Sequence, residues 1–177
     1  MITSLVVTVI GPDRPGIVSL LSDRAKGFDA NWAESRMASL AGQFAGMVHF
    51  QVPSAKADAL AKALRELESH GLSIVIAASE AEPPAQKRRL VKLELVGQDR
   101  PGILRDISRA LADRGVSIEE LETEIGSGAW SGESLFKVRA LLLVPAALPV
   151  DDLRKGLEAL ANELMVDLAL GGEGGAE

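Results

Sequence analysis

The sequence predicts an α+β protein made of two consecutive βαββαβ units, each with one four-stranded sheet and two helices. Three observations indicate this fold. The phrase GPDRPGI at 11–17 recurs as GQDRPGI at 97–103, 86 positions later. An apolar run enters each copy of the phrase, and a stretch with helical periodicity leaves it. The length of 177 residues suits two small domains, each with its own modest core.

The repeat extends well beyond the shared phrase. Residues 4–36 align with residues 90–122 at the same offset of 86 without a gap. An alignment of this length indicates duplication rather than coincidence. Matched positions carry similar residues: Leu5 and Val91, Val7 and Leu93, Val9 and Leu95, Ile17 and Ile103, Leu21 and Ile107, Ser22 and Ser108, Glu34 and Glu120.

The first half of each unit is a strand, a turn and a helix. Apolar runs at 4–10 and 90–96 predict strands that enter the phrase. After the phrase, apolar residues recur at helical spacing and predict one buried helix face. They are Ile17, Leu20, Leu21 and Phe28 in the first unit, and Ile103, Ile107, Ala110 and Leu111 in the second.

The second half of each unit is a hairpin, a helix and a closing strand. We expect hairpins at 31–40 with 43–52 and at 117–126 with 134–144, both stopped by a Val-Pro pair because proline cannot extend the ladder. Helices carrying Leu60, Leu64 and Leu67 or Leu153, Leu157 and Leu160 follow, and strands at 72–77 and 164–170 close the units. This order is that of the ferredoxin-like sandwich.

These elements divide the chain into domains at 1–79 and 90–170, joined by a linker at 80–89 that is rich in proline and charge. We expect the tail at 171–177 to be disordered. The copies differ most near Gly126–Glu133, where the second gains six residues, including Trp130. We expect this tryptophan to pack over a nearby core. The first unit has only the tight Ala41-Gly42-Gln43 turn there.

Composition excludes several classes of function. The net charge is −6, so we expect no direct binding to nucleic acid, and we interpret Lys87-Arg88-Arg89 as part of a solvated linker. The chain has no cysteine, and His49 and His70 are poorly spaced for a metal, so no metal or cofactor is expected. No apolar stretch is long enough to span a membrane, and we expect a cytoplasmic protein.

The chemistry of the repeated phrase follows from its place between a strand and a helix. Its first glycine allows unusual backbone angles, its proline suits the first helical turn, and its aspartate can accept from free N–H groups. Its second glycine leaves the helix start bare, which suits a bound carboxylate. A turn that only caps the helix explains the same residues, so both interpretations remain open. The positions are Gly11, Asp13, Pro15, Gly16 and Ile17, and Gly97, Asp99, Pro101, Gly102 and Ile103.

The first unit runs from a strand through GxDRPGI and a helix to a second strand that opens with Asn31. This order resembles the ACT domain, a regulatory module that often binds amino acids. The resemblance covers about residues 2–170. Two longer phrases, NWAESRMASLAGQFAGMVHFQVP and ANELMVDLAL, resemble the glycine cleavage system transcriptional repressor family. The resemblance therefore implies two ACT domains in tandem.

The resemblance also implies a ligand site and partners. In amino-acid-binding ACT domains the turn holds the ligand carboxylate, and an asparagine early in the second strand helps to fix the ligand. The matching residue is Asn31 in the first unit but Ser117 in the second, so we expect binding in the first unit only. The resemblance implies glycine as the candidate ligand and repression through a separate DNA-binding regulator. We also expect the two units to associate with each other and the chain to form a homodimer.

Two other classes of function, an enzyme and a ligand-free interaction module, compete with this interpretation. No catalytic motif is present, and Glu120, Glu122 and Glu124 are better explained by charge pairing with Lys137 and Arg139 on the outer sheet face. A ligand-free ACT interaction module, or a regulatory subunit of an enzyme of amino-acid metabolism, is the alternative. The outer face of the first unit favours contacts with a partner or a second copy, because Val6, Thr8 and Met47 replace Lys92, Glu94 and Arg139.

Overall fold

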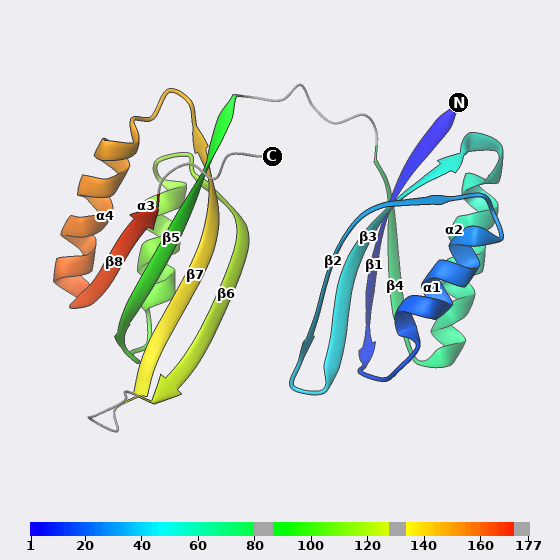
Figure 1. Ribbon diagram of the computed structural model, residues 1–177, viewed down its shortest axis with the longest axis horizontal. Coiled ribbons are helices and arrows are strands. Elements are labelled where there is room, and N and C mark those ends of the chain that lie inside the picture. Colours follow the sequence, from blue (N-terminus) through cyan, green and yellow to red (C-terminus); the bar gives the residue numbers. More distant parts are fainter. Residues whose placement is uncertain (80–86, 128–133, 172–177) are drawn as a thin grey trace. The chain divides into compact units, whose positions relative to one another are not determined.

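The computed structural model of the chain describes residues 1–79, 87–127 and 134–171. The chain divides into two compact units, Met1–Pro83 and Pro84–Glu177. Each unit has one sheet with two helices packed on one of its faces (Figure 1). The predicted α+β class and the repeated βαββαβ order are confirmed.

The first unit is an antiparallel sheet in the order β2-β3-β1-β4. Its elements are β1 (Ile2–Pro12), α1 (Ile17–Lys26), β2 (Asn31–Leu40), β3 (Gln43–Pro53), α2 (Ala57–Arg65) and β4 (Ser73–Ser79), with 3₁₀ turns η1 (Ser54–Lys56) and η2 (Glu66–His70) on either side of α2. Two central strands flanked by two edge strands leave β2 as one edge of the sheet.

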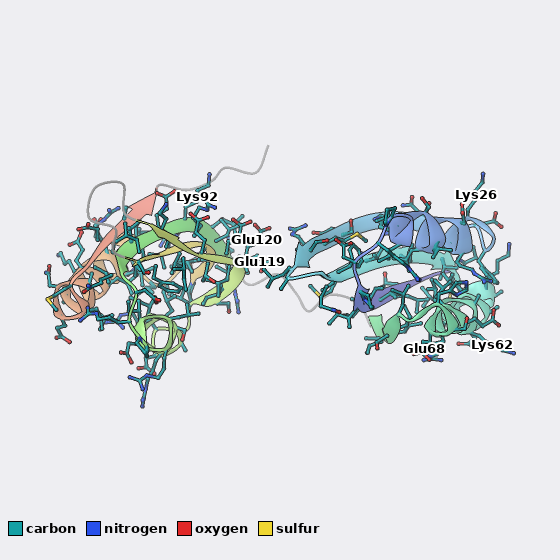
Figure 2. The ribbon with its side chains drawn as sticks, turned by 90° about the horizontal axis from the view of Figure 1, so that it is seen from below. Lys26, Lys62, Glu68, Lys92, Glu119 and Glu120 are labelled. Carbon is teal, nitrogen blue, oxygen red and sulfur yellow. The ribbon has the colours of Figure 1, made fainter. Side chains whose placement is uncertain are left out.

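The second unit repeats this order, with the sheet arranged β6-β7-β5-β8. Its elements are β5 (Arg88–Gln98), α3 (Ile103–Ala112), β6 (Ser117–Ser127), β7 (Ser134–Pro145), α4 (Val150–Leu164) and β8 (Val166–Gly171). Charged side chains such as Lys26 and Lys62 of the first unit and Lys92 of the second point away from the ribbon (Figure 2).

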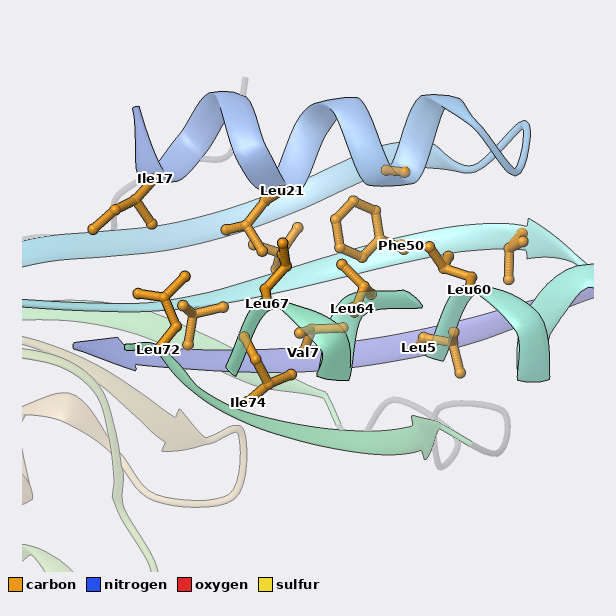
Figure 3. Close-up of a cluster of buried hydrophobic side chains, with 14 of the residues drawn as sticks. Leu5, Val7, Ile17, Leu21, Phe50, Leu60, Leu64, Leu67, Leu72 and Ile74 are labelled. Carbon is orange, nitrogen blue, oxygen red and sulfur yellow. The ribbon is translucent and has the colours of Figure 1, made fainter. Parts of the chain in front are cut away.

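Each unit has its own apolar core between the sheet and its helices. In the first unit, Leu21 of α1 and Leu64 of α2 are fully buried against Val7 and Phe50 of the sheet (Figure 3). The matching core of the second unit includes Leu93, Leu111 and Leu157. Every fully buried residue among those described is apolar, so burial of side chains from water is the main source of stability in each unit.

Several details differ from the sequence expectations. Ala25 and Ala161 complete the buried helix faces, whereas Leu20 and Leu160 are only half-buried because they lie at the edges of these faces. Phe28 lies after α1 rather than in it. The strands also extend through the prolines: Pro53 pairs with Ile2 and Pro145 with Arg88 at the strand ends.

The expected end of the linker is shifted, because β5 begins at Arg88. Arg88 and Arg89 are therefore strand residues rather than part of a solvated linker. Arg89 is half-buried and donates a hydrogen bond to the carbonyl oxygen of Leu148 (2.6 Å). Gly171, expected in the tail, ends β8. The rest of the expected tail, most of the linker and Trp130 lie outside the described residues.

Candidate functional site

The repeated phrase begins as part of the sheet. The backbone N–H of Asp13 donates to the carbonyl oxygen of Gly42 (2.9 Å), and that of Asp99 donates to Ser134 (2.9 Å). These bonds continue the pairing of β1 with β3 and of β5 with β7 past the last strand residue. The aspartates thus fasten the turn to the neighbouring hairpin through their backbone.

The first glycine of the phrase is required by close packing rather than by an unusual backbone angle. A Cβ atom on Gly11 would lie 2.8 Å from the carbonyl oxygen of Gly71, and one on Gly97 would lie 2.4 Å from Cγ1 of Val166. Both glycines are strand residues, and neither has a positive φ. Our expectation of special angles here was wrong: the glycines let the start of the closing strand approach the end of the first.

The second glycine does have the left-handed conformation that favours glycine. Gly16 (φ 96°) and Gly102 (φ 101°) are the N-cap residues of α1 and α3. No side chain caps either helix, so the expected capping by Asp13 and Asp99 is wrong. Pro15 lies in the turn before the N-cap and not in the first helical turn, and the same holds for Pro101, because the left-handed glycine delays the helix to the following residue.

The helix starts are consequently open. The first helical bond runs from the Leu20 N–H to the Gly16 carbonyl oxygen (2.9 Å), so the N–H groups of 17–19 have no backbone partner among the described residues. Apart from its two chain neighbours, no residue places an atom within 4 Å of a Cβ built on Gly16. Ile17 itself is buried in the core. Three free N–H groups beside open space can receive a carboxylate.

The corresponding start in the second unit already faces a carboxylate. Asp106 lies in the first turn of α3, where the first unit has Leu20, and its Oδ2 lies 3.9 Å from a Cβ placed on Gly102. Asp106 Oδ1 also accepts from Nε of Arg105 (2.8 Å). This hydrogen bond and the negative charge of Asp106 raise the pKa of the Arg105 guanidinium above its ordinary value. An anionic ligand would meet repulsion from Asp106 in the second unit but not in the first.

The structure does not bring Asn31 to the turn of its own unit. Asn31 pairs with Gln51, which pairs with Ser4, whereas Gly11 lies seven residues further along β1. At about 3.3 Å per residue the separation is about 23 Å. In the second unit, Ser117 pairs with Leu143, which pairs with Leu90, and Leu90 lies seven residues before Gly97 along β5. Within one unit an amino acid can therefore contact the turn or the start of the second strand, but not both.

The arginine of the phrase has a role that the sequence analysis missed. Nη2 of Arg14 donates to the carbonyl oxygen of His70 at the end of η2, and Nη2 of Arg100 donates to that of Leu164 at the end of α4. The only sequence signal for this role was that the arginine is kept in both copies. These bonds give the repeated phrase a structural function in both units.

The outer sheet face of the second unit and the two histidines complete the set of candidate polar groups. Glu122 pairs with Arg139 (3.5 Å) and Glu124 with Lys137 (3.4 Å), which confirms the predicted cross-strand charge pairing. His70 ends η2, directly before the left-handed Gly71. His49 lies on a central strand and is half-buried, and its Nε2 is enclosed without a hydrogen-bond partner among the described residues.

The part of the chain that the structure describes holds neither a metal-binding cluster nor a membrane-spanning helix. Within 1–79, 87–127 and 134–171, no three His, Asp or Glu side chains gather in a way that suits a metal ion. In the same ranges no helix is long and apolar enough to cross a membrane.

Comparison with known proteins identifies the class of domain. Family models described as ACT domain match residues 3–77 and 91–132. The chain therefore belongs to the ACT-domain family and carries two ACT domains in tandem.

Two solved structures resemble nearly the whole chain. One is an unknown protein from Galdieria sulphuraria, with 31% identity and a TM-score of 0.86 over 98% of this chain and 99% of that one. The other is named as a candidate glycine cleavage system transcriptional repressor, with 19% identity and a TM-score of 0.72 over 97% of both chains. At this identity the second likeness establishes the shared fold. The comparison with curated proteins gave no match.

Proposed function

We propose that this chain is a non-enzymatic cytoplasmic regulator that responds to a small amino acid, with glycine as the candidate, and represses transcription through a separate DNA-binding protein. Support comes from the tandem ACT domains and from the likeness to a structure named as a candidate repressor of the glycine cleavage system. The acidic balance of the chain argues against direct contact with phosphate backbones.

The observation that carries the ligand proposal is the difference between the two helix starts. In the first unit three backbone N–H groups face open space beside Gly16, whereas Asp106 lies beside Gly102 in the second. We propose that the ligand carboxylate binds at 16–19 in the first unit. Asn31 can then take part only from a second ACT unit, such as one in another copy of the chain.

The test exploits the position at which the copies differ. Glycine is titrated into ¹⁵N-labelled protein, and amide shifts at 16–19 are followed by NMR. Binding is expected at about micromolar to millimolar concentration, because so small a ligand makes few contacts. Leu20→Asp, which copies the acidic residue of the second unit, should remove these shifts. Asp106→Leu is the matched control and should leave them unchanged.

Variants of the expected site residues refine the test. Gly16→Val should weaken binding because valine strains a left-handed position, and Asn31→Ala should weaken it if a second copy completes the site. Ser117→Ala should have little effect. Absence of shifts at 16–19 with glycine, serine and alanine at millimolar concentration would leave the phrase a purely structural turn.

The route to transcription is tested separately. The tagged full chain should capture a DNA-binding regulator from an extract of its own cells, and purified protein should not bind duplex DNA. Tight, salt-sensitive binding to DNA would contradict this route.

A ligand-free interaction module is the second candidate, and the outer face of the first sheet favours it. Ile10, Met47 and Val75 are exposed there at 50%, 52% and 65%. Thr8 pairs with both Met47 and Val75, so Met47, Thr8 and Val75 form one row across β3, β1 and β4, and Ile10 lies two residues along β1 from Thr8. We propose that a second copy covers this face in a homodimer. A homodimer that forms without any response to amino acids would favour this candidate.

A further inference from the structure

His49 is a titratable group to which the proposed function gives no role. It lies on the central strand β3 between Val48 and Phe50, which are both fully buried under the helices. Because successive side chains of a strand point to opposite faces, the imidazole lies on the outer face of the first sheet, away from the two helices (Figure 1). The ring is half-buried there, and its Nε2 is enclosed without a hydrogen-bond partner among the described residues.

The neighbours of His49 on this outer face come from all four strands of the sheet. Val6 of β1 and Glu34 of β2 pair with it directly, and Ala77 of β4 pairs with Val6. Side chains two residues away along β3 point to the same face, and they are Met47 and Gln51. Glu34 is the only charged group among these five neighbours, so the ring lies in a mainly apolar part of the face.

The carboxylate of Glu34 is directed to another residue. Its Oε1 accepts a hydrogen bond from Nη1 of Arg36 (3.0 Å), and no hydrogen bond joins it to Nε2 of His49. The side chains of Glu34 and Arg36 are 64% and 54% exposed. Attraction between charges that are largely in water is weak, so Glu34 would compensate little for a positive charge on the ring.

A second copy on this face would cover His49 as well. The proposed homodimer packs on the row of Met47, Thr8 and Val75, and His49 lies in the adjacent row, two residues along β3. A stable interface buries about 800 Å² on each partner. One row across four strands spans only about 130 Å², from about 4.8 Å per strand and about 6.8 Å per row. The interface must therefore extend over several rows, including the row of His49.

The duplication supplies an internal comparison for this row. Leu141 occupies the matching position in the second unit, because it pairs with Lys92 of β5 as His49 pairs with Val6 of β1. The second sheet thus has a permanent charge beside an apolar side chain. The first sheet instead has an apolar side chain beside a ring whose charge depends on pH.

We propose that His49 makes the association of two copies through the first sheet sensitive to pH, an inference that rests on the homodimer proposed above. The neutral ring packs in the interface beside Val6 and Met47. Protonation would make both ring nitrogens donors, and burial of this cation without an acceptor is unfavourable. In the monomer the ring is partly in water and takes up the proton more readily. The dimer therefore binds fewer protons than two monomers do, and association weakens as the pH falls.

Sedimentation velocity of the full chain at about pH 7.5 and about pH 5.5 tests this inference, because histidine changes its charge between these values. The dissociation constant of the dimer should rise about tenfold to a hundredfold at the lower pH, since each dimer holds two His49 rings. Circular dichroism at both pH values checks that the chain stays folded. A dimer of equal affinity at both values overturns the inference and leaves the homodimer standing, whereas a monomer at both values contradicts the two together.

Variants of the two histidines of the chain assign the response to one of them. His49→Leu copies the second unit, and His49→Gln keeps a polar side chain that cannot become charged. Both should dimerise with an affinity that no longer depends on pH. His70→Gln is the matched control at the exposed end of η2, and it should respond to pH as the unaltered chain does. A response that survives both changes at His49, or that is lost in His70→Gln, overturns the inference.

Glu34→Gln separates the ring from the carboxylate that pairs with it across the strands. This variant should keep the full response, because the change in charge occurs on the imidazole and Glu34 is bonded to Arg36. Loss of the response in Glu34→Gln would assign the titration to the carboxylate and overturn the role of His49.

Discussion

The guanidinium of Arg14 donates a hydrogen bond to the carbonyl oxygen of His70, 56 residues away in the sequence. Arg100 makes the same contact with Leu164 in the second unit. The arginine thus links the β1–α1 turn to the end of η2 in the first unit, and the β5–α3 turn to the end of α4 in the second. The last carbonyl groups of a helical segment have no partner within the helix, so they are free to accept these bonds. The repeated phrase therefore joins elements from the start and the end of each unit.

Loss of this arginine should destabilise the unit that carries it. Arg100→Ala should lower the free energy of unfolding by about 1–2 kcal/mol, and the more exposed Arg14→Ala by about 1 kcal/mol or less. Urea denaturation followed by circular dichroism measures both. Arg65→Ala is the control, because this exposed arginine has no hydrogen bond or ion pair with the described residues. Equal effects of all three changes would argue against the role of the phrase.

Gly97→Ala should destabilise the second unit by about 1–3 kcal/mol, as overpacking does in well-packed cores. The added Cβ would lie 2.4 Å from Val166 Cγ1 and 3.0 Å from its Cβ. Removing Cγ1 in a Gly97→Ala/Val166→Ala double variant should restore part of the loss relative to Val166→Ala alone, although the Cβ of residue 166 remains. Gly27→Ala is the control, because its φ is −63° and no atom lies closer than 3.5 Å. Thermal denaturation gives the comparison.

Ala41→Asn should stabilise the first unit by up to about 1 kcal/mol, because asparagine tolerates the left-handed conformation better than alanine does. Ala41 (φ 49°) and Gly42 (φ 77°) form the two-residue turn between β2 and β3. Asn-Gly is the preferred pair for such a turn. Gly42→Ala should destabilise for the same reason. A fall in the melting temperature of Ala41→Asn would contradict this interpretation.

The order of elements was predictable because periodicity and the duplication are local signals. The hairpin limits and the pairs of Glu122 and Glu124 with positive residues followed from the same alternation. The capping role of Asp13 was wrong: the left-handed Gly16 is the N-cap and α1 begins only at Ile17, four residues after Asp13, with no side-chain cap. The contact of Arg14 with His70 depends on tertiary packing that no local pattern encodes.

The candidate site was harder to predict from the sequence. Asn31 follows the turn by only 14 residues, yet α1 carries the chain back along the sheet, so the two lie at opposite ends of the unit.

Met47→Arg should prevent self-association of the chain. The outer face of the second sheet is charged, and Arg139 occupies the position that matches Met47, so the change gives the first sheet the character of the second. In a homodimer that packs like faces together, the new arginines would be buried without partners, which costs several kcal/mol. Sedimentation velocity over a range of concentrations should show a dimer for the unaltered chain and a monomer for Met47→Arg. Ile125→Arg is the control, because Ile125 is equally apolar and 65% exposed but lies in the second unit. A monomer at all concentrations before any substitution, or a dimer that survives Met47→Arg, would show that this face does not join two copies.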